Sequence, residues 1–221
     1  MRERVRVQVQ VQVQVQVQVR EHEGMRAGAS GMTSIELLLE DAGEARVRAE
    51  SEALAAAGMS SLARHDAPSN RPHVTLLARS TPVAHPLGMD DAALPLPLVL
   101  GPPVLLGDGD RRVLARAVVA SAALLALHAE VLRAAGRGDD PPHLSPGSWL
   151  PHVTLARRIR LADVPAALGL LGPPIEAQGV ALRRWDAATA TVSLVAGARA
   201  APASVTRGYA SGSCRCRAAG R

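Results

Sequence analysis

The chain contains no phenylalanine and no lysine, and its aromatic side chains are limited to Trp149, Trp185 and Tyr209. Proteins that bind single-stranded nucleic acid stack the bases on aromatic side chains, and this chain has few to offer. All 25 basic residues are arginines, which is typical of a GC-rich coding sequence. The net charge of +5 is therefore weak support for a nucleic-acid partner, although the planar guanidinium suits a phosphate group well.

Cysteine and long apolar runs are also scarce. Cys214 and Cys216 are the two cysteines. They could supply two metal ligands or a strained disulfide, and we interpret them instead as incidental tail residues. No segment resembles a signal peptide or is long enough to cross a bilayer. We therefore expect a cytoplasmic monomer with no membrane partner.

The two ends of the chain differ in composition from the middle. Residues 5–19 alternate Val and Gln almost without exception, which is low complexity rather than a domain strand. We expect residues 1–32 to be a disordered arm, or the result of a start site assigned too early. Residues 197–221 are rich in Ala, Arg, Gly and Ser and predict a disordered tail. The domain is then residues 33–196, which is long enough to bury a core.

The most informative feature that is present is a pentapeptide that occurs twice, PHVTL at residues 72–76 and again at 151–155. Residues two apart on a strand point to the same side. His73 and Thr75 therefore share one face, and His152 and Thr154 share another. The spacing of 79 residues predicts two halves of one domain, each presenting a histidine beside a threonine.

Hydrophobic periodicity predicts a similar order of elements in both halves, in which a strand and a helix precede the strand that carries the pentapeptide. Ser121 is expected to cap the second of these helices. The Gly-Pro-Pro sequence at 101–103 is expected to divide one apolar segment into two strands. The expected strands are 34–39, 73–79, 96–106 (as a pair), 112–119, 152–158, 175–185 and 189–195, and the expected helices are 41–57, 122–135 and 162–171.

Two histidines and two threonines around one ligand can transfer a phosphoryl group without a metal or a cofactor. One imidazole removes a proton from the attacking oxygen, and the other donates a proton to the leaving oxygen. The threonine hydroxyls can donate to the non-bridging oxygens, where negative charge is concentrated. The sequence shows no Asp/Glu cluster that would suggest a metal site.

The two His-x-Thr signatures, His73-Val74-Thr75-Leu76 and His152-Val153-Thr154-Leu155, resemble those of the 2H phosphoesterase superfamily, in particular the 2′-5′ RNA ligase and RNA 2′,3′-cyclic phosphodiesterase-like proteins. The resemblance implies a bilobal, pseudo-twofold α+β fold with two antiparallel sheets, helices outside and a central cleft. It also implies an enzyme that opens 2′,3′-cyclic or 2′,5′-linked phosphodiesters of nucleotides or RNA ends, and in some members joins 2′,5′ linkages in reverse.

Carried over by position, His73 and His152 are the acid–base pair, and Thr75 and Thr154 hold the phosphate. The sequence does not indicate which histidine is the acid. The alternative from another class is a non-catalytic protein that binds nucleotides or RNA ends in the same cleft. A further alternative is that the histidines are separate, internally hydrogen-bonded core residues.

Several other residues near the two motifs are candidate substrate contacts. Trp149 could stack on a base or be a hydrophobic plug beside its strand. His65 and His143 could reach the cleft, but a histidine in a loop is more often exposed and without a role. The arginines that flank the motifs could bind phosphate oxygens, led by the pair placed six residues after each histidine: Arg79 and Arg158, then Arg71 and Arg157.

Overall fold

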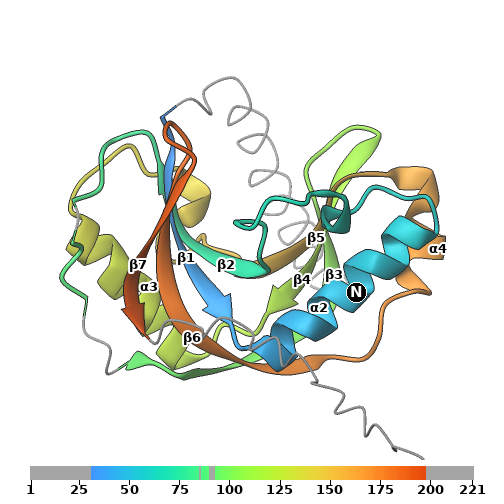
Figure 1. Cartoon of the computed structure of the whole chain (residues 1–221), viewed down its shortest axis with the longest axis horizontal. Helices are drawn as coiled ribbons and strands as arrows, with labels where there is room; N and C mark the ends of the chain where they lie inside the picture. The colour runs from blue at the N-terminus through green and yellow to red at the C-terminus, as the bar shows by residue number, and fades with distance from the viewer. Residues whose placement is uncertain (1–30, 85, 90–92, 198–221) are drawn as a thin grey trace, which may run out of the picture.

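The computed structural model describes residues 31–84, 86–89 and 93–197 (Figure 1). The interpretations of the Val–Gln arm through residue 30 and of the tail from residue 198, with Cys214 and Cys216, lie outside the described residues. Within the described part of the chain, no helix is both long enough and apolar enough to cross a membrane.

Strands dominate the described chain, and two long helices connect them. The elements in chain order are β1 (Thr33–Leu39), α2 (Asp41–Ala56), η1 (Leu62–Arg64), β2 (His73–Arg79), β3 (Leu96–Leu106), β4 (Arg111–Val118), α3 (Ala122–Ala135), η3 (Pro142–Leu144), β5 (His152–Arg160), η4 (Leu161–Asp163), α4 (Val164–Leu168), β6 (Ile175–Asp186) and β7 (Thr191–Gly197).

Most of these elements follow the sequence pattern. The strand expected over 73–79 has those bounds, and the Ser121 side chain accepts a hydrogen bond from the Leu124 N–H, as expected for the cap of α3. The segment 96–106 is one strand and not the expected pair, because its ladder with β4 skips from Leu100 to Pro103 and then resumes. The helix expected over 162–171 is shorter and is divided between η4 and α4.

All strands pair antiparallel in a single sheet of order β1-β2-β5-β4-β3-β6-β7, and β1 also pairs with β6. Six strands therefore form a closed ring, with β7 added beside β6. The long strand β6 pairs first with β3 and then with β1, and Gly179 has a partner on each side. A Cβ at Gly179 would lie 2.8 Å from the Leu37 side chain, so the position at which β6 changes partners requires glycine.

The ring closes on its other side through one bridge between β2 and β5, Val74 with Val153. The antiparallel α+β fold expected from the sequence is confirmed. The two expected sheets are the halves of one continuous sheet, joined along β6 and at the Val74–Val153 bridge.

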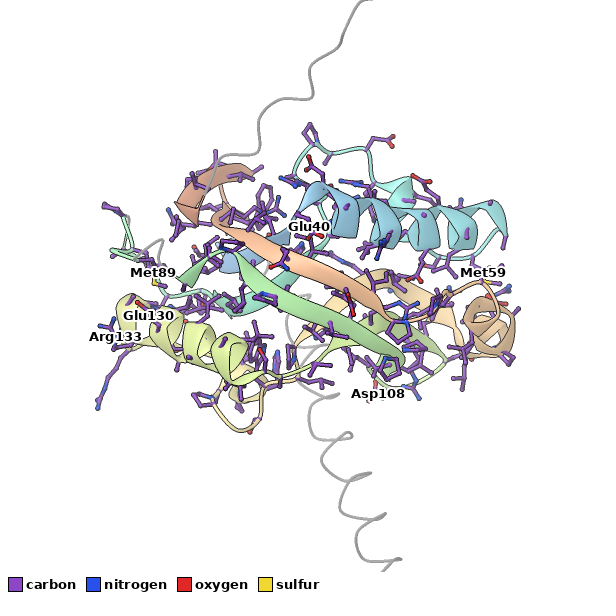
Figure 2. All side chains as sticks on the ribbon, turned by 90° about the horizontal axis from the view of Figure 1, so that it is seen from below. Glu40, Met59, Met89, Asp108, Glu130 and Arg133 are labelled. Carbon is purple, nitrogen blue, oxygen red and sulfur yellow. The ribbon has the colours of Figure 1, made fainter. Side chains whose placement is uncertain are left out.

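The two long helices cover different halves of the sheet. In Figure 2, α2, which begins after Glu40, and α3, which carries Glu130 and Arg133, lie on either side of β3 and β6. Helix α2 contributes Val47 and Leu54 to the core, and α3 contributes residues at helical spacing, among them Leu124, Leu127 and Val131. Burying each such side chain stabilises the fold by about 1.5–3 kcal/mol.

The halves are related residue by residue. Four pairs of the β1–β2 ladder become pairs of the β4–β5 ladder when their residue numbers are raised by 79, and both ladders bulge at the equivalent residue, Leu76 in β2 and Leu155 in β5. The β4–β5 ladder has a second irregularity, between Arg112 and Leu114, that the β1–β2 ladder lacks. The pairs Ile35–Leu77, Glu36–Thr75, Leu37–Val74 and Leu38–His73 correspond to Leu114–Ala156, Ala115–Thr154, Arg116–Val153 and Ala117–His152.

Candidate active site

The two PHVTL strands meet where β2 and β5 are bridged. Val74 and Val153 pair directly and are fully buried in the core. The residues on either side of each valine point to the opposite face of the sheet, and all four are partly exposed. The antiparallel register through this pair places His73 opposite Thr154 and Thr75 opposite His152.

This register brings the two motifs into one site. Residues directly opposite in an antiparallel pair have Cβ atoms about 4.5–5.5 Å apart, and diagonal neighbours such as His73 and His152 are about 7–8 Å apart. Exchanging the two strands exchanges His73 with His152 and Thr75 with Thr154, so the bridge lies on the pseudo-twofold axis. We call these four residues the His-Thr quartet.

Both imidazoles are held in the same way. Nδ1 of His73 lies 2.7 Å from the Arg71 carbonyl oxygen, and Nδ1 of His152 lies 2.8 Å from the Leu150 carbonyl oxygen. A carbonyl can only accept, so each ring carries its proton on Nδ1 when neutral. Nε2 is then the basic nitrogen of both rings, the atom that can take up a proton.

The surroundings of the two rings differ. Nε2 of His73 lies 3.6 Å from Oε1 of Glu36, a buried carboxylate on the adjacent strand β1. Glu36 accepts hydrogen bonds from the Ser34 hydroxyl at 2.7 Å and from Nε of Arg183 at 2.7 Å. Burial alone would raise the pKa of Glu36, but His73 and Arg183, with the bond from Ser34, hold this pKa below its usual value.

Burial lowers the pKa of His152, and the neighbouring His73 and His143 lower it further. The hydrogen bond to the Leu150 carbonyl acts in the opposite direction and does not outweigh these effects. His152 is therefore neutral at neutral pH, which is the form that can accept a proton.

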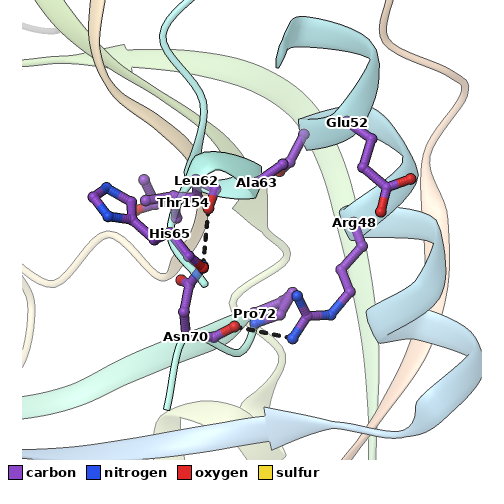
Figure 3. Close-up of a pocket in the computed structure, with 9 residues that line it drawn as sticks. Arg48, Glu52, Leu62, Ala63, His65, Asn70, Pro72 and Thr154 are labelled. Carbon is purple, nitrogen blue, oxygen red and sulfur yellow. Dashed lines mark hydrogen bonds between the residues drawn. The ribbon is translucent and has the colours of Figure 1, made fainter. Parts of the chain in front are cut away.

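A small hollow of about 70 Å³ opens beside Thr154, between helix α2 and the loop that leads to β2 (Figure 3). Asn70 organises this loop, because its side-chain amide donates to the Leu62 and His65 carbonyl oxygens, while its own carbonyl accepts from Arg48. His65 lines this hollow and His143 is a neighbour of His152, so both loop histidines approach the quartet.

A larger hollow of about 810 Å³ lies over β1, β6 and β7. Leu38, which pairs with His73, and Arg183, which pairs with Glu36, both line it, so it borders the face of the sheet that carries His73. Most of its other lining is aliphatic, with Val192 and Leu194 exposed on β7. Arg71 lies at its rim.

Arg79 does not contact the site, contrary to the sequence expectation. Its side chain is fully buried and donates to the carbonyl oxygens of Ala135 and Gly136 at the end of α3, and it pairs with Asp140. The bulge at Leu76 shifts the alternation of β2, so Arg79 does not share the face of His73 and Thr75. It ties α3 to the sheet.

The other flanking residues have different environments. Arg71 lines the larger hollow and pairs with Glu44. Arg157 and Arg158 are exposed on β5, and neither lines either hollow described above. Trp149 stacks on His128 with ring centroids 3.9 Å apart and donates to the Thr75 carbonyl oxygen at 3.1 Å. It therefore occupies the position of a plug that supports β2.

Sequence reasoning missed Glu36 and Arg183. Glu36 is the one charged residue in the fully buried strand β1, and that contrast was a usable signal. Arg183 is one of many arginines, and only the pairing of β6 with β1 reveals its contact with Glu36. Among the residues that the structure describes, no group of three or more His, Cys, Asp or Glu side chains is placed to hold a metal ion.

Residues 89–196 match the family model described as the 2′-5′ RNA ligase superfamily. This segment, just under half of the chain, is therefore similar to the family that the two motifs resemble. The match includes the second pentapeptide and begins after the first, so the role of His73 rests on the repeat and on the register of β2 with β5.

A comparison with curated protein sequences finds no match. Among solved structures, the chain is similar to Usb1 of Kluyveromyces marxianus, with 12% sequence identity and a TM-score of 0.42, over 76% of this chain and 98% of that chain.

Proposed function

We propose that this protein is a metal-independent phosphodiesterase that opens 2′,3′-cyclic phosphates or cleaves 2′,5′ linkages of nucleotides or RNA ends. The observation that carries the proposal is the Val74–Val153 bridge, whose register sets each histidine opposite the threonine of the other motif. The same site could run the reverse reaction and join a 2′,5′ linkage, because an acid–base pair exchanges its roles when the direction of the reaction is reversed.

In the forward reaction, Nε2 of one histidine removes a proton from water, and the water oxygen forms a bond to phosphorus. The bond from phosphorus to the 3′ oxygen breaks, and Nε2 of the other histidine donates a proton to that oxygen. The products are a 2′-phosphate and a free 3′ hydroxyl. The hydroxyls of Thr75 and Thr154 donate to the non-bridging oxygens as negative charge increases on them.

The two hollows indicate how a nucleotide would lie. The small one beside Thr154 has room for little more than a phosphate oxygen and its waters, whereas the one over β6 and β7 is in the size range of ligand pockets. We propose that the nucleoside lies over β7, against Val192 and Leu194. An aliphatic lining offers few hydrogen bonds to base edges, so we expect weak discrimination among bases.

The direct test is turnover of a nucleoside 2′,3′-cyclic monophosphate in the presence of EDTA. We expect the wild-type protein to produce a 2′-phosphate, and His73→Ala and His152→Ala each to lower kcat by about 10²–10⁴, the usual contribution of a general acid or base. Circular dichroism should show that both variants remain folded. Arg133→Ala, which changes an exposed side chain of α3, is the control and should keep full activity.

The same assay addresses the non-catalytic alternative. If the protein binds a nucleoside 2′-monophosphate but turns over none of the cyclic substrate, it is a binding protein and the proposed activity is wrong. Turnover that survives in both histidine variants would also contradict the proposal.

A further inference from the structure

The pseudo-twofold symmetry of the site is broken at one position on the strand beside each pentapeptide. On β1, Glu36 pairs with Thr75 of the first pentapeptide. On β4, the equivalent residue is Ala115, which pairs with Thr154 of the second. The partners of Glu36 are also missing from the second half. The residue 79 positions after Ser34 is Val113, which has no hydroxyl. On its other side, Glu36 pairs with Arg183 of β6, whereas Ala115 pairs with Val104 of β3.

Glu36 is a charged group at a buried position, where ionisation is energetically unfavourable. It is 5% exposed in a strand whose other side chains are uncharged, and an isolated carboxylate buried in this way would lose its hydration without compensation. The bonds from Ser34 and Arg183 compensate for part of that loss and fix the carboxylate. Its Oε1 then lies 3.6 Å from Nε2 of His73.

We propose that Glu36 is a positioning residue that assigns different roles to the two histidines, so that His73 is the proton donor and His152 the proton acceptor when the cyclic phosphate opens. The inference rests on the proposed function and adds to it the direction of proton transfer. A protonated His73 forms an ion pair with Glu36, and His152 has no acidic residue at the equivalent position, which is occupied by Ala115.

The other charged and titratable neighbours agree with this assignment. On the Glu36 side, β6 contributes Arg183, which is already hydrogen-bonded to the carboxylate, and the loop before β2 contributes Arg71, which is paired with Glu44. On the other side, His152 has His73 and His143 as neighbours, and together with burial they lower its pKa.

The proton balance of the step is complete. Neutral His152 takes one proton from the attacking water, and protonated His73 gives one proton to the leaving 3′ oxygen. After release of the product, one proton passes from His152 to His73, directly or through water, and the starting state is restored. Glu36 stays ionised throughout and exchanges no proton with the substrate.

The test compares two substrates that differ in the leaving group. A nucleoside 2′,3′-cyclic monophosphate needs a proton on its leaving alkoxide, whereas a thymidine 4-nitrophenyl phosphodiester releases nitrophenolate without one. We expect Glu36→Gln to lower kcat on the cyclic substrate by about 10- to 100-fold, the usual effect of losing a group that orients a reacting side chain. On the nitrophenyl substrate, Glu36→Gln should lose less than about threefold.

The histidine variants should show the same division. His73→Ala should keep most of its activity on the nitrophenyl substrate and lose its activity on the cyclic one, and His152→Ala should lose both. The matched control is Glu50→Gln, which makes the same chemical change in a buried Glu–Arg pair. Its Arg116 pairs with Val153 on the core side of the sheet, opposite the face that carries the quartet. Glu50→Gln should leave the ratio of the two activities unchanged.

The assignment would be overturned if Glu36→Gln lowered kcat equally on both substrates. It would also be overturned if His152→Ala, and not His73→Ala, kept its activity on the nitrophenyl substrate. Wild-type protein that turns over neither substrate would instead contradict the proposed function itself. If Glu36→Gln does not fold, a pH titration of the wild-type protein, followed by NMR of the imidazole rings, tests the assignment of the two roles. We expect His152 to be the first of the two rings to lose its proton as the pH rises, and the reverse order would refute the inference.

Discussion

Arginine is abundant in this chain, and individual arginines have very different functions. Arg79 is buried and holds the end of α3, Arg183 fixes the carboxylate beside His73, and Arg158 is exposed on β5. Arg79 and Arg158 occupy equivalent positions after the two histidines and were the leading phosphate ligands by sequence. Both strands bulge after the threonine, but the β4–β5 ladder has a second irregularity between Arg112 and Leu114, and Arg79 is buried where Arg158 is exposed. Neither difference can be seen in the residue type.

The structural role of Arg79 predicts a loss of stability with little effect on binding. Arg79→Met keeps most of the aliphatic stem but leaves Asp140 and the carbonyl oxygens of Ala135 and Gly136 without their donor. We expect the free energy of unfolding, measured in urea, to fall by about 3 kcal/mol. Arg158→Met should change it by less than about 0.5 kcal/mol. If Arg79→Met raised KM and left stability unchanged, Arg79 would be a substrate contact after all.

At the scale of elements, the alternation rule places the His-Thr quartet correctly and then fails within the same strand. Strict alternation over 73–79 would place Leu77 on the face of His73 and Thr75, and the bulge at Leu76 ends that alternation after Thr75. A bulge depends on how two strands fit together, so a single segment of sequence does not reveal it. The quartet lies on the two repeated strands and could be predicted from them, whereas the contact of Glu36 with His73 depends on how β1 pairs with β2.

The strand β7 should contribute to substrate binding more than to chemistry. Leu194 lines the larger hollow and is 45% exposed. Leu194→Asp should therefore raise KM for the cyclic nucleotide by about 10-fold, by removing apolar contact and adding a negative charge beside a phosphate ester, with kcat nearly unchanged. Leu168→Asp is the matched control, because Leu168 on α4 is equally exposed at 44%. Unchanged KM in Leu194→Asp would show that the nucleoside does not lie over β7.

At the scale of the whole molecule, the order of elements and the two-part organisation could be predicted from one repeated pentapeptide and from hydrophobic periodicity. The closed ring of strands could not, because it depends on β6, whose two halves pair with strands from different parts of the chain. Nothing in the composition of residues 175–186 distinguishes a strand with two successive partners from an ordinary one. The correspondence at an offset of 79 residues became visible only from the pairing registers.

Two histidines with lowered pKa values predict how stability depends on pH. Burial lowers the pKa of both His128 and His152 in the folded protein, below the usual value of 6.5. The unfolded chain therefore binds more protons as the pH falls below 6.5, and the free energy of unfolding decreases in that range. The lowered pKa of Glu36 acts only at lower pH, because its contribution is lost below its usual value of 4.5. Thermal unfolding should give a lower Tm at pH 5 than at pH 7.

His128 provides a variant that isolates this effect. His128→Gln removes one of the two groups, so its Tm should change less between pH 7 and pH 5 than the Tm of the wild-type protein, whatever its Tm at pH 7. Equal changes in Tm for the two proteins would show that burial of neutral His128 does not contribute to the acid sensitivity.

The central claim is that two strands bring His73 and His152 to one phosphate group, and imidazole NMR during titration with a nucleoside 2′-monophosphate tests it most directly. The account predicts that the Nε2 resonances of both rings shift with the same dissociation constant, while those of His128, stacked on Trp149, do not move. Shifts in only one of the two rings, or shifts with two different dissociation constants, would contradict it.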